Sequence, residues 1–189
     1  MNDILLSFIL GIVQGLTEFL PISSSAHLLF PTLIFGSNDL GLYFDISVHA
    51  GTLMAVVFYF RNEIFLMSKS LFVTNNFNED KNLAIQLIIA TIPIVILGFI
   101  FRDLISQRIF SINDIAISNL IFASILLFAF LNNKGKKTLI NITILGACFV
   151  GLFQCFALIP GTSRSGAAIT ACLLIGLSMK DDSKFAFLL

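Results

Sequence analysis

The sequence predicts an all-α, polytopic integral membrane protein, with helices that span the bilayer and two re-entrant helical hairpins arranged as an inverted repeat. Three observations lead to this fold class. Apolar residues make up 57% of the 189-residue chain and charged residues 12%, against a charged fraction of about 25% in soluble domains. Several apolar runs are long enough to cross a membrane. Two shorter apolar runs each end in a polar tip that contains a proline.

Charge and cysteine usage narrow the function classes. The formal net charge is zero and no long basic run occurs, so we expect no nucleic-acid partner. Three cysteines lie in apolar runs without metal-ligand spacing, and we interpret them as small buried apolar residues: Cys148, Cys155 and Cys172. The N-terminus has no basic segment and Asp3 is acidic, so we expect the first helix to stay in the mature chain.

The first expected element is a hairpin that enters the membrane and returns. The apolar run 4–20 is interrupted by polar residues and ended by Pro21, while the run 27–35 is too short to span alone. The serines at 23–25 are able to cap the second helix of the hairpin. An irregular tip at 21–26 is tolerated at membrane depth where it is buried in protein or lines a cavity.

Three spanning helices follow, at residues 43–60, 83–101 and 115–131. We expect polar connections between the elements at residues 38–41, 61–82, 102–114 and 132–137. The last of these, NNKGKK, is purely positive, so the positive-inside rule places it in the cytoplasm. The connection 61–82 is then cytoplasmic, and 38–41 and 102–114 lie outside.

A second hairpin closes the chain. Residues 139–160 descend from the cytoplasmic side to a Pro-Gly tip, and residues 166–179 return to that side, so the two hairpins enter from opposite faces. We therefore interpret residues 1–189 as one membrane domain, with a first repeat at 1–131 and the start of a second at 139–189. The chain stops within another apolar run, and we expect the second repeat to be incomplete by two or three helices.

The two tips share a pattern. A glycine and a glutamine three residues apart are followed by a proline and, three residues beyond it, by a serine. The residues are Gly11, Gln14, Pro21 and Ser24 in the first copy and, with one residue of slip, Gly151, Gln154, Pro160 and Ser163 in the second. Broken, polar-tipped helices at corresponding places in two halves indicate an internal repeat with a binding site near the bilayer midplane.

The tip residues suit a phosphorylated ligand. Arg164 can place its forked guanidinium on phosphate oxygens. The loop at Gly161 and the helix N-terminus after it offer backbone N–H groups to an anion. Glu18 and Gln14, one turn apart, can hold a divalent cation through oxygen. A serine hydroxyl within reach of His27 supplies a nucleophile and a base, or a proton donor to a leaving group.

Structural alternatives accompany these interpretations. The Pro-Gly pair can be a simple turn, the serines can be helix caps, and Arg164 can serve only to neutralise Glu18. Asp45 and His49 share a face of the helix expected at 43–60, and their spacing permits an Asp–His hydrogen bond. We interpret this pair as structural, with support of the nearby site as the alternative.

The same residues resemble a known family. The segments GIVQGLTEFLPISSSAH at 11–27 and PGTSRSG at 160–166 are similar to the (E/Q)-x-x-x-E and P-G-x-S-R-S-x-x-T signatures of the bacterial undecaprenyl-diphosphatase (bacitracin-resistance) family. The D-x-x-x-H-x-G-T-L context at 45–53 also agrees. The resemblance implies a hydrolase of the inner membrane that converts undecaprenyl diphosphate to the monophosphate, recycles this carrier for peptidoglycan synthesis and confers bacitracin resistance. It further implies a site open to the extracytoplasmic side and a divalent cation, Mg²⁺ or Ca²⁺.

The resemblance also implies roles for individual residues. Gln14 and Glu18 fall on the pair that binds metal or diphosphate. The catalytic set is Glu18, Ser24, His27 and Arg164. The binding set is Gln14, Ser23, Ser25, Gly161, Ser163, Ser165 and Thr170, where Thr170 substitutes for the family threonine that Ala168 replaces. The expected partners are undecaprenyl diphosphate and the lipid bilayer, and a homodimer is left open. Alternatives are a lipid-phosphate or small-anion transporter or flippase, and an inactive fragment.

Overall fold

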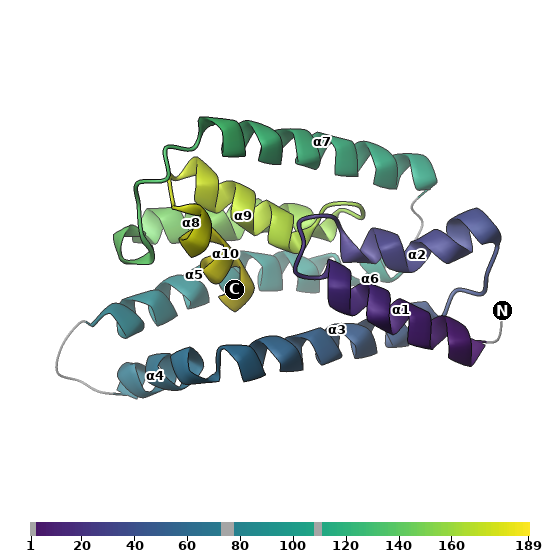
Figure 1. Cartoon of the computed structure of the whole chain (residues 1–189), viewed down its shortest axis with the longest axis horizontal. Coiled ribbons are helices and arrows are strands. Elements are labelled where there is room, and N and C mark those ends of the chain that lie inside the picture. The colour runs from purple at the N-terminus through teal and green to yellow at the C-terminus, as the bar shows by residue number, and fades with distance from the viewer. Residues whose placement is uncertain (1–2, 73–77, 108–110) are drawn as a thin grey trace.

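The computed structural model describes residues 3–72, 78–107 and 111–189 and is built from helices (Figure 1). The α-helices are α1 (Asp3–Thr17), α2 (Ser24–Phe35), α3 (Gly41–Tyr59), α4 (Arg61–Phe72), α5 (Glu79–Ile100), α6 (Arg102–Ser106), α7 (Ile112–Asn132), α8 (Ile144–Gln154), α9 (Arg164–Leu174) and α10 (Met179–Leu188). Two 3₁₀ turns, η1 (Leu139–Asn141) and η2 (Cys155–Leu158), complete the described elements. The predicted all-α class is confirmed.

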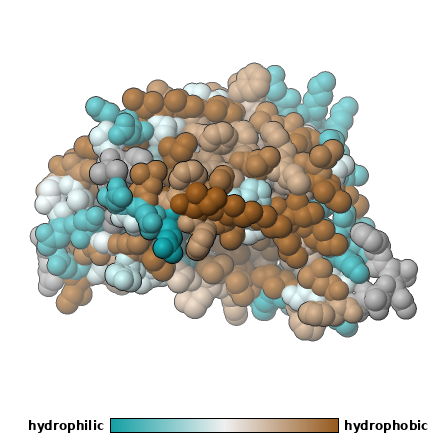
Figure 2. Space-filling view, turned by 180° about the vertical axis from the view of Figure 1, so that it is seen from behind, coloured by the Kyte–Doolittle hydropathy of each residue, from teal (hydrophilic) through white to brown (hydrophobic). Residues whose placement is uncertain are grey.

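Three of these helices are long and apolar enough to cross a membrane. They are α3 with 19 residues, α5 with 22 and α7 with 21, and they coincide with the three spans predicted from the sequence. No more than 22% of the apolar window of any of them is buried inside the protein. Apolar side chains cover most of the face seen in Figure 2, and polar ones gather mainly toward its ends. Such a surface is stable in lipid rather than in water, so the chain is a polytopic membrane protein.

The two predicted hairpins correspond to two pairs of short helices. In the first, α1 turns into α2; in the second, α8 and η2 turn into α9 (Figure 1). All are shorter than a membrane span: the two helices of the first pair have 15 and 12 residues and α9 has 11. That the pairs enter a bilayer from opposite faces, as an inverted repeat, stays a prediction of the sequence.

The two tips are capped differently. Ser163 accepts a hydrogen bond from the Gly166 N–H at 3.1 Å and so caps α9. At the start of α2 the N-cap residue is Ser23, whose φ of 59° is left-handed and whose side chain accepts no bond from the helix. Its hydroxyl lies 3.3 Å from that of Ser25 instead. The predicted serine cap of α2 is therefore wrong for Ser23, whose hydroxyl contacts the side chain of Ser25 and not a backbone N–H of the helix.

The connection predicted at 61–82 is largely helical. Helix α4 follows α3 almost without interruption and buries Met67 and Ser70 toward the core. Its charged residues suggest a loop, but its apolar side chains recur on one face and pack beside α5. Asn78 then caps α5 by accepting a bond from the Lys81 N–H at 2.9 Å. The predicted polar connection is therefore helical at residues 61–72, and residues 73–77 lie outside the described residues.

Small residues pack the second hairpin closely onto its neighbours. At Gly151 a Cβ would meet the backbone of Ala90 on α5, and Gln154 Nε2 donates to the Ala90 carbonyl at 2.9 Å. Close backbone approach of this kind is typical of membrane helix pairs. The core thus holds the second tip in place.

Of the three cysteines, Cys172 is buried and the other two are half-buried, so the prediction of buried cysteines is confirmed for Cys172.

Candidate active site

The two tips meet around one polar cavity of about 180 Å³. Its walls are Glu18, Ser23, Ser24 and Ser25 from the first tip, His49 from α3, and Ala157, Thr162, Ser163, Arg164 and Ser165 from the second. Ser165 Oγ joins the tips directly, since it donates to the carbonyl of Leu20 at 3.1 Å. Residues 145 positions apart therefore form one site, as the repeat predicted.

Glu18 is the centre of this cavity. Its Oε2 accepts hydrogen bonds from Ser24 Oγ at 2.6 Å and from Gln14 Nε2 at 2.9 Å, and it lies 3.6 Å from His49 Nε2. The side chain is 13% exposed. A carboxylate this enclosed needs hydrogen-bond donors on its oxygens, and Ser24 and Gln14 of the first hairpin supply them.

Arg164 provides the positive charge of the cavity. Its Nη2 is 3.9 Å from Glu18 Oε1, and the guanidinium is about half exposed. A charge-assisted bond between such groups is normally 2.7–2.9 Å long. At the longer distance the ion pair leaves guanidinium N–H donors of Arg164 available for a second partner. Its planar fork of N–H donors remains turned toward the cavity, where it can bind an anion.

Two helices also begin at this cavity. The first residues of α2 and of α9 line it, and an α-helix N-terminus carries partial positive charge and backbone N–H groups without intrahelical partners. Both hairpins therefore direct the same kind of anion-binding end at one space. Together with Arg164 this makes the cavity suited to a multiply charged anion such as a diphosphate.

The structure brings a different histidine to the cavity from the one predicted. His27 is half-buried, with Nδ1 2.8 Å from the Ser23 carbonyl, and does not line the cavity. His49 does, and its Nδ1 lies 2.7 Å from the Asp45 carbonyl. Because a carbonyl only accepts, this contact assigns the proton to Nδ1 and leaves Nε2 facing Glu18. The predicted Asp–His hydrogen bond is present, and it goes to the main-chain carbonyl of Asp45.

Besides His27, three predicted site residues lie outside the cavity walls. Gly161 packs against Ile115 and Ser118 of α7. Thr170 is 1% exposed, and its hydroxyl donates to the Gly166 carbonyl at 2.6 Å, so the structure does not support it as a substitute ligand. Gln14 is fully buried behind Glu18. Neither His49 nor Thr162 was predicted as a site residue from the sequence. The D-x-x-x-H context, which ends at His49, was a sequence feature that could have indicated His49.

The residues fit a divalent cation only in company with a ligand. In the described part of the chain no group of three or more His, Cys, Asp or Glu side chains could hold a metal. Glu18 lines the cavity, and beside it Gln14 Oε1 is buried without a described hydrogen-bond partner. Magnesium commonly takes one or two carboxylates and completes its shell with phosphate oxygens and water. This donor set therefore suits a cation that arrives with a diphosphate.

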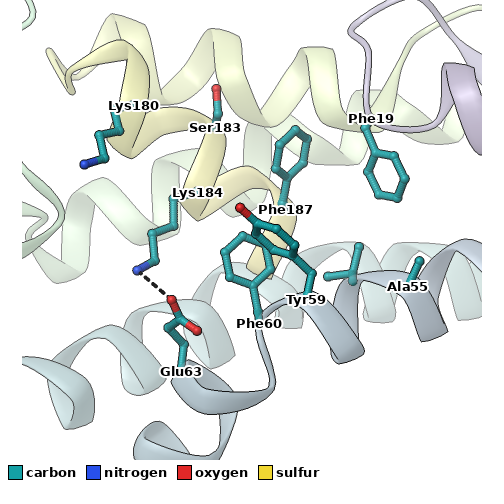
Figure 3. A pocket seen from close by; sticks show the side chains of 10 residues that line it. Phe19, Ala55, Tyr59, Phe60, Glu63, Lys180, Ser183, Lys184 and Phe187 are labelled. Carbon is teal, nitrogen blue, oxygen red and sulfur yellow. Dashed lines mark hydrogen bonds and ion pairs between the residues drawn. The ribbon is translucent and has the colours of Figure 1, made fainter.

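One apolar cavity adjoins the polar one, and a second apolar cavity adjoins the first. The first, about 460 Å³, shares Glu18, His49 and Arg164 with the polar cavity. The second, about 590 Å³, lies between the α3–α4 junction and α10 and shares Phe19, Val56 and Phe187 with the first. Figure 3 shows the aromatic walls of this second cavity and the Lys184–Glu63 ion pair of 3.4 Å at one end. The polar site thus borders an apolar space.

Comparison with known proteins agrees with these motifs. The family model of the bacitracin resistance protein BacA matches residues 7–189, a range that contains both tips. The chain belongs to the BacA family. Proteins named undecaprenyl-diphosphatase are similar to nearly the whole chain. The protein from Saccharophagus degradans is 43% identical over 189 residues, 99% of this chain and 71% of the relative.

Two further relatives agree. The undecaprenyl-diphosphatase of Alcanivorax borkumensis is 45% identical over 186 residues, 97% of this chain and 70% of the relative. Undecaprenyl-diphosphatase 1 of Pseudoalteromonas translucida is 42% identical over 184 residues, 96% of this chain and 69% of the relative. Identity of this extent covers the helices that carry the cavity as well as the two BacA tips.

Proposed function

We propose that this BacA-family chain is an undecaprenyl-diphosphate phosphatase, which hydrolyses the lipid diphosphate to undecaprenyl phosphate and inorganic phosphate. The names of its relatives support this substrate. One observation carries the reaction type. Ser24 Oγ donates to Glu18 Oε2 at 2.6 Å inside a cavity that also holds Arg164 and two helix N-termini.

The geometry assigns a task to each group. Arg164 and the N-termini of α2 and α9 bind the diphosphate oxygens and offset their charge. Glu18 already accepts the Ser24 proton, so it is placed to act as base for that hydroxyl, or for a water held in its position. Attack on the terminal phosphorus breaks its bond to the bridging oxygen, which leaves with undecaprenyl phosphate. Attack by water gives inorganic phosphate directly, whereas attack by Ser24 gives a phosphoserine that a water then hydrolyses to release phosphate. Glu18 and Gln14 would hold a divalent cation that also binds the diphosphate, and the cation would withdraw charge from the phosphoryl oxygens.

The adjoining apolar cavities support a lipid substrate. A diphosphate in the polar cavity lies next to a space walled largely by side chains such as Ile46, Leu53 and Val57. A polyisoprenoid tail can occupy such a space without exposure to water. A small soluble anion has no apolar part that could occupy this space.

A transporter or flippase is the second candidate function. Paired broken helices with their N-termini at a central site favour it. A carrier needs the arginine and the backbone donors, but it has little need of a hydroxyl held against a carboxylate. The contact between Ser24 and Glu18 therefore favours hydrolysis.

The proposed setting is the bacterial inner membrane. The positive connection 132–137 on the cytoplasmic side leaves the first tip to enter from outside, so the site faces the extracytoplasmic side. A homodimer is compatible with this arrangement. The pathway step is recycling of the cell-wall lipid carrier, with bacitracin resistance as its consequence.

The experiment is phosphate release from undecaprenyl diphosphate by the purified 189-residue chain in detergent, with and without Mg²⁺ or Ca²⁺. Arg164→Ala is expected to abolish release, because the planar fork on the diphosphate is lost. Arg102→Ala is the matched control. This arginine is exposed, its Nε lies 3.3 Å from Asp103 Oδ1, and it does not line the cavity. Release by Arg164→Ala at the wild-type rate would refute the site. Transfer of the lipid across vesicles without hydrolysis would favour the carrier.

A further inference from the structure

Unpartnered polar atoms point to a ligand in the cavity. In the described residues three buried side-chain atoms have no hydrogen-bond partner: Gln14 Oε1, Gln86 Oε1 and Thr162 Oγ1. Two of the three belong to the site, one beside Glu18 and one in the cavity wall. Burying a hydroxyl without a partner is unfavourable, so such a group is normally retained for a reason.

Thr162 stands out among its neighbours. It is 3% exposed and lines the polar cavity. The adjacent hydroxyls have partners: Ser163 Oγ accepts from the Gly166 N–H at 3.1 Å, and Ser165 Oγ donates to the Leu20 carbonyl at 3.1 Å. The hydroxyl of Thr162 is the one in this loop that the described residues leave unsatisfied.

The backbone around Thr162 is held firmly. Its N–H donates to the Ile159 carbonyl at 3.1 Å, Gly161 before it is packed against α7, and Ser163 after it caps α9. The side chain therefore keeps its place in the wall, and rotation about χ1 changes only the direction in which the hydroxyl points. It can turn to a ligand without any movement of the loop.

We propose that Thr162 is a phosphate-binding residue, whose hydroxyl donates to an oxygen of the diphosphate held by Arg164 and the α9 N-terminus. Phosphate oxygens are strong acceptors, and a threonine hydroxyl is a donor that lacks one. The inference deepens the proposed function, but it needs only the phosphate chemistry of the ligand. A lipid diphosphate and free pyrophosphate present that chemistry alike.

The proposal predicts opposite effects on stability and on binding. Thr162→Val keeps the shape of the side chain and removes the unpartnered hydroxyl. The unliganded variant is therefore expected to unfold at a higher temperature than the wild type. Its affinity for phosphate ligands is expected to fall about tenfold or more, the range for a hydrogen bond to a charged group. Thr162→Ser, which keeps the hydroxyl, should bind within about threefold of the wild type.

The test measures thermal unfolding of the purified chain in detergent, with increasing inorganic pyrophosphate and Mg²⁺. A second arm measures KM for undecaprenyl diphosphate, and a third replaces pyrophosphate by inorganic phosphate. Thr91→Val is the matched control, because the Thr91 hydroxyl donates to the Leu87 carbonyl at 2.8 Å and Thr91 does not line the cavity. It should lower stability and leave the response to pyrophosphate unchanged.

The outcomes separate this inference from the proposed function. Loss of the pyrophosphate response in Thr162→Val, with its retention in Thr162→Ser, supports the inference even if the wild type releases no phosphate from the lipid. Wild-type pyrophosphate binding and KM in Thr162→Val would overturn it while leaving hydrolysis untouched. A wild type that pyrophosphate does not stabilise, or a Thr162→Val chain less stable than the wild type, would also count against it.

Discussion

Gly161→Ala tests whether packing on α7 positions the second tip. Gly161 has a φ of 91°, a left-handed conformation that costs a residue with a Cβ about 1–2 kcal/mol. The new Cβ would also collide with Ser118 Oγ and the Ile115 carbonyl. Ser118 cannot move freely, because its hydroxyl donates to the Pro160 carbonyl at 2.5 Å. Overpacking of this kind costs about 1–3 kcal/mol, so we expect a total loss of about 2–5 kcal/mol.

The assay is thermal unfolding in detergent, paired with phosphate release. For chains of this size about 2–5 kcal/mol corresponds to a Tm lower by roughly 4–20 °C. Activity should fall as well, because Arg164 moves with the tip. Gly41→Ala is the matched control: Gly41 has a φ of 80° but nothing lies within 4 Å of a Cβ there. It should show the backbone cost alone. Equal losses at Gly41 and Gly161 would refute the packing argument.

Two further predictions concern titratable side chains. His49→Ala is expected to lower kcat/KM for undecaprenyl diphosphate about tenfold or more. The loss should be larger than for His27→Ala, because His49 lines the cavity and His27 does not. Phosphate-release kinetics with a larger loss in His27→Ala would contradict this. Burial raises the pKa of Asp182 from 3.8 to about 6, so the folded chain loses stability as pH rises from about 4 to about 6. Asp182→Asn should therefore raise the free energy of unfolding at pH 7–8 by at most about 3 kcal/mol, and raise Tm with it, but give no gain near pH 4. An equal gain at both pH values would exclude titration of Asp182 as the cause.

Much of the architecture can be predicted because membrane helices follow from local composition. The three spans agree with α3, α5 and α7, since a long apolar run in lipid has to satisfy its backbone within one helix. The pairing of Gln14 with Glu18 follows equally from helix periodicity and is present at 2.9 Å. The meeting of the two tips was predicted from the repeat, because polar groups within apolar runs need partners.

Other features depended on contacts that no local pattern reveals. Helix α4 resembles a loop in composition, and its buried face exists only because α5 lies beside it. Nothing local shows that Ser23 takes a left-handed φ of 59°, because the conformation is imposed by the closure of the tip.

The sequence by itself determined the membrane class, the three spans and the two polar tips, because hydrophobic length and helix periodicity are local properties. Only the tertiary structure decided which histidine joins the tips. His27 and His49 are both one turn from plausible partners, but the packing of α3 beside the first hairpin directs His49 toward Glu18. It likewise left Thr162 in the wall with its hydroxyl unsatisfied. Hydrogen-bond partners between distant segments depend on how helices pack, and packing is a property of the whole chain.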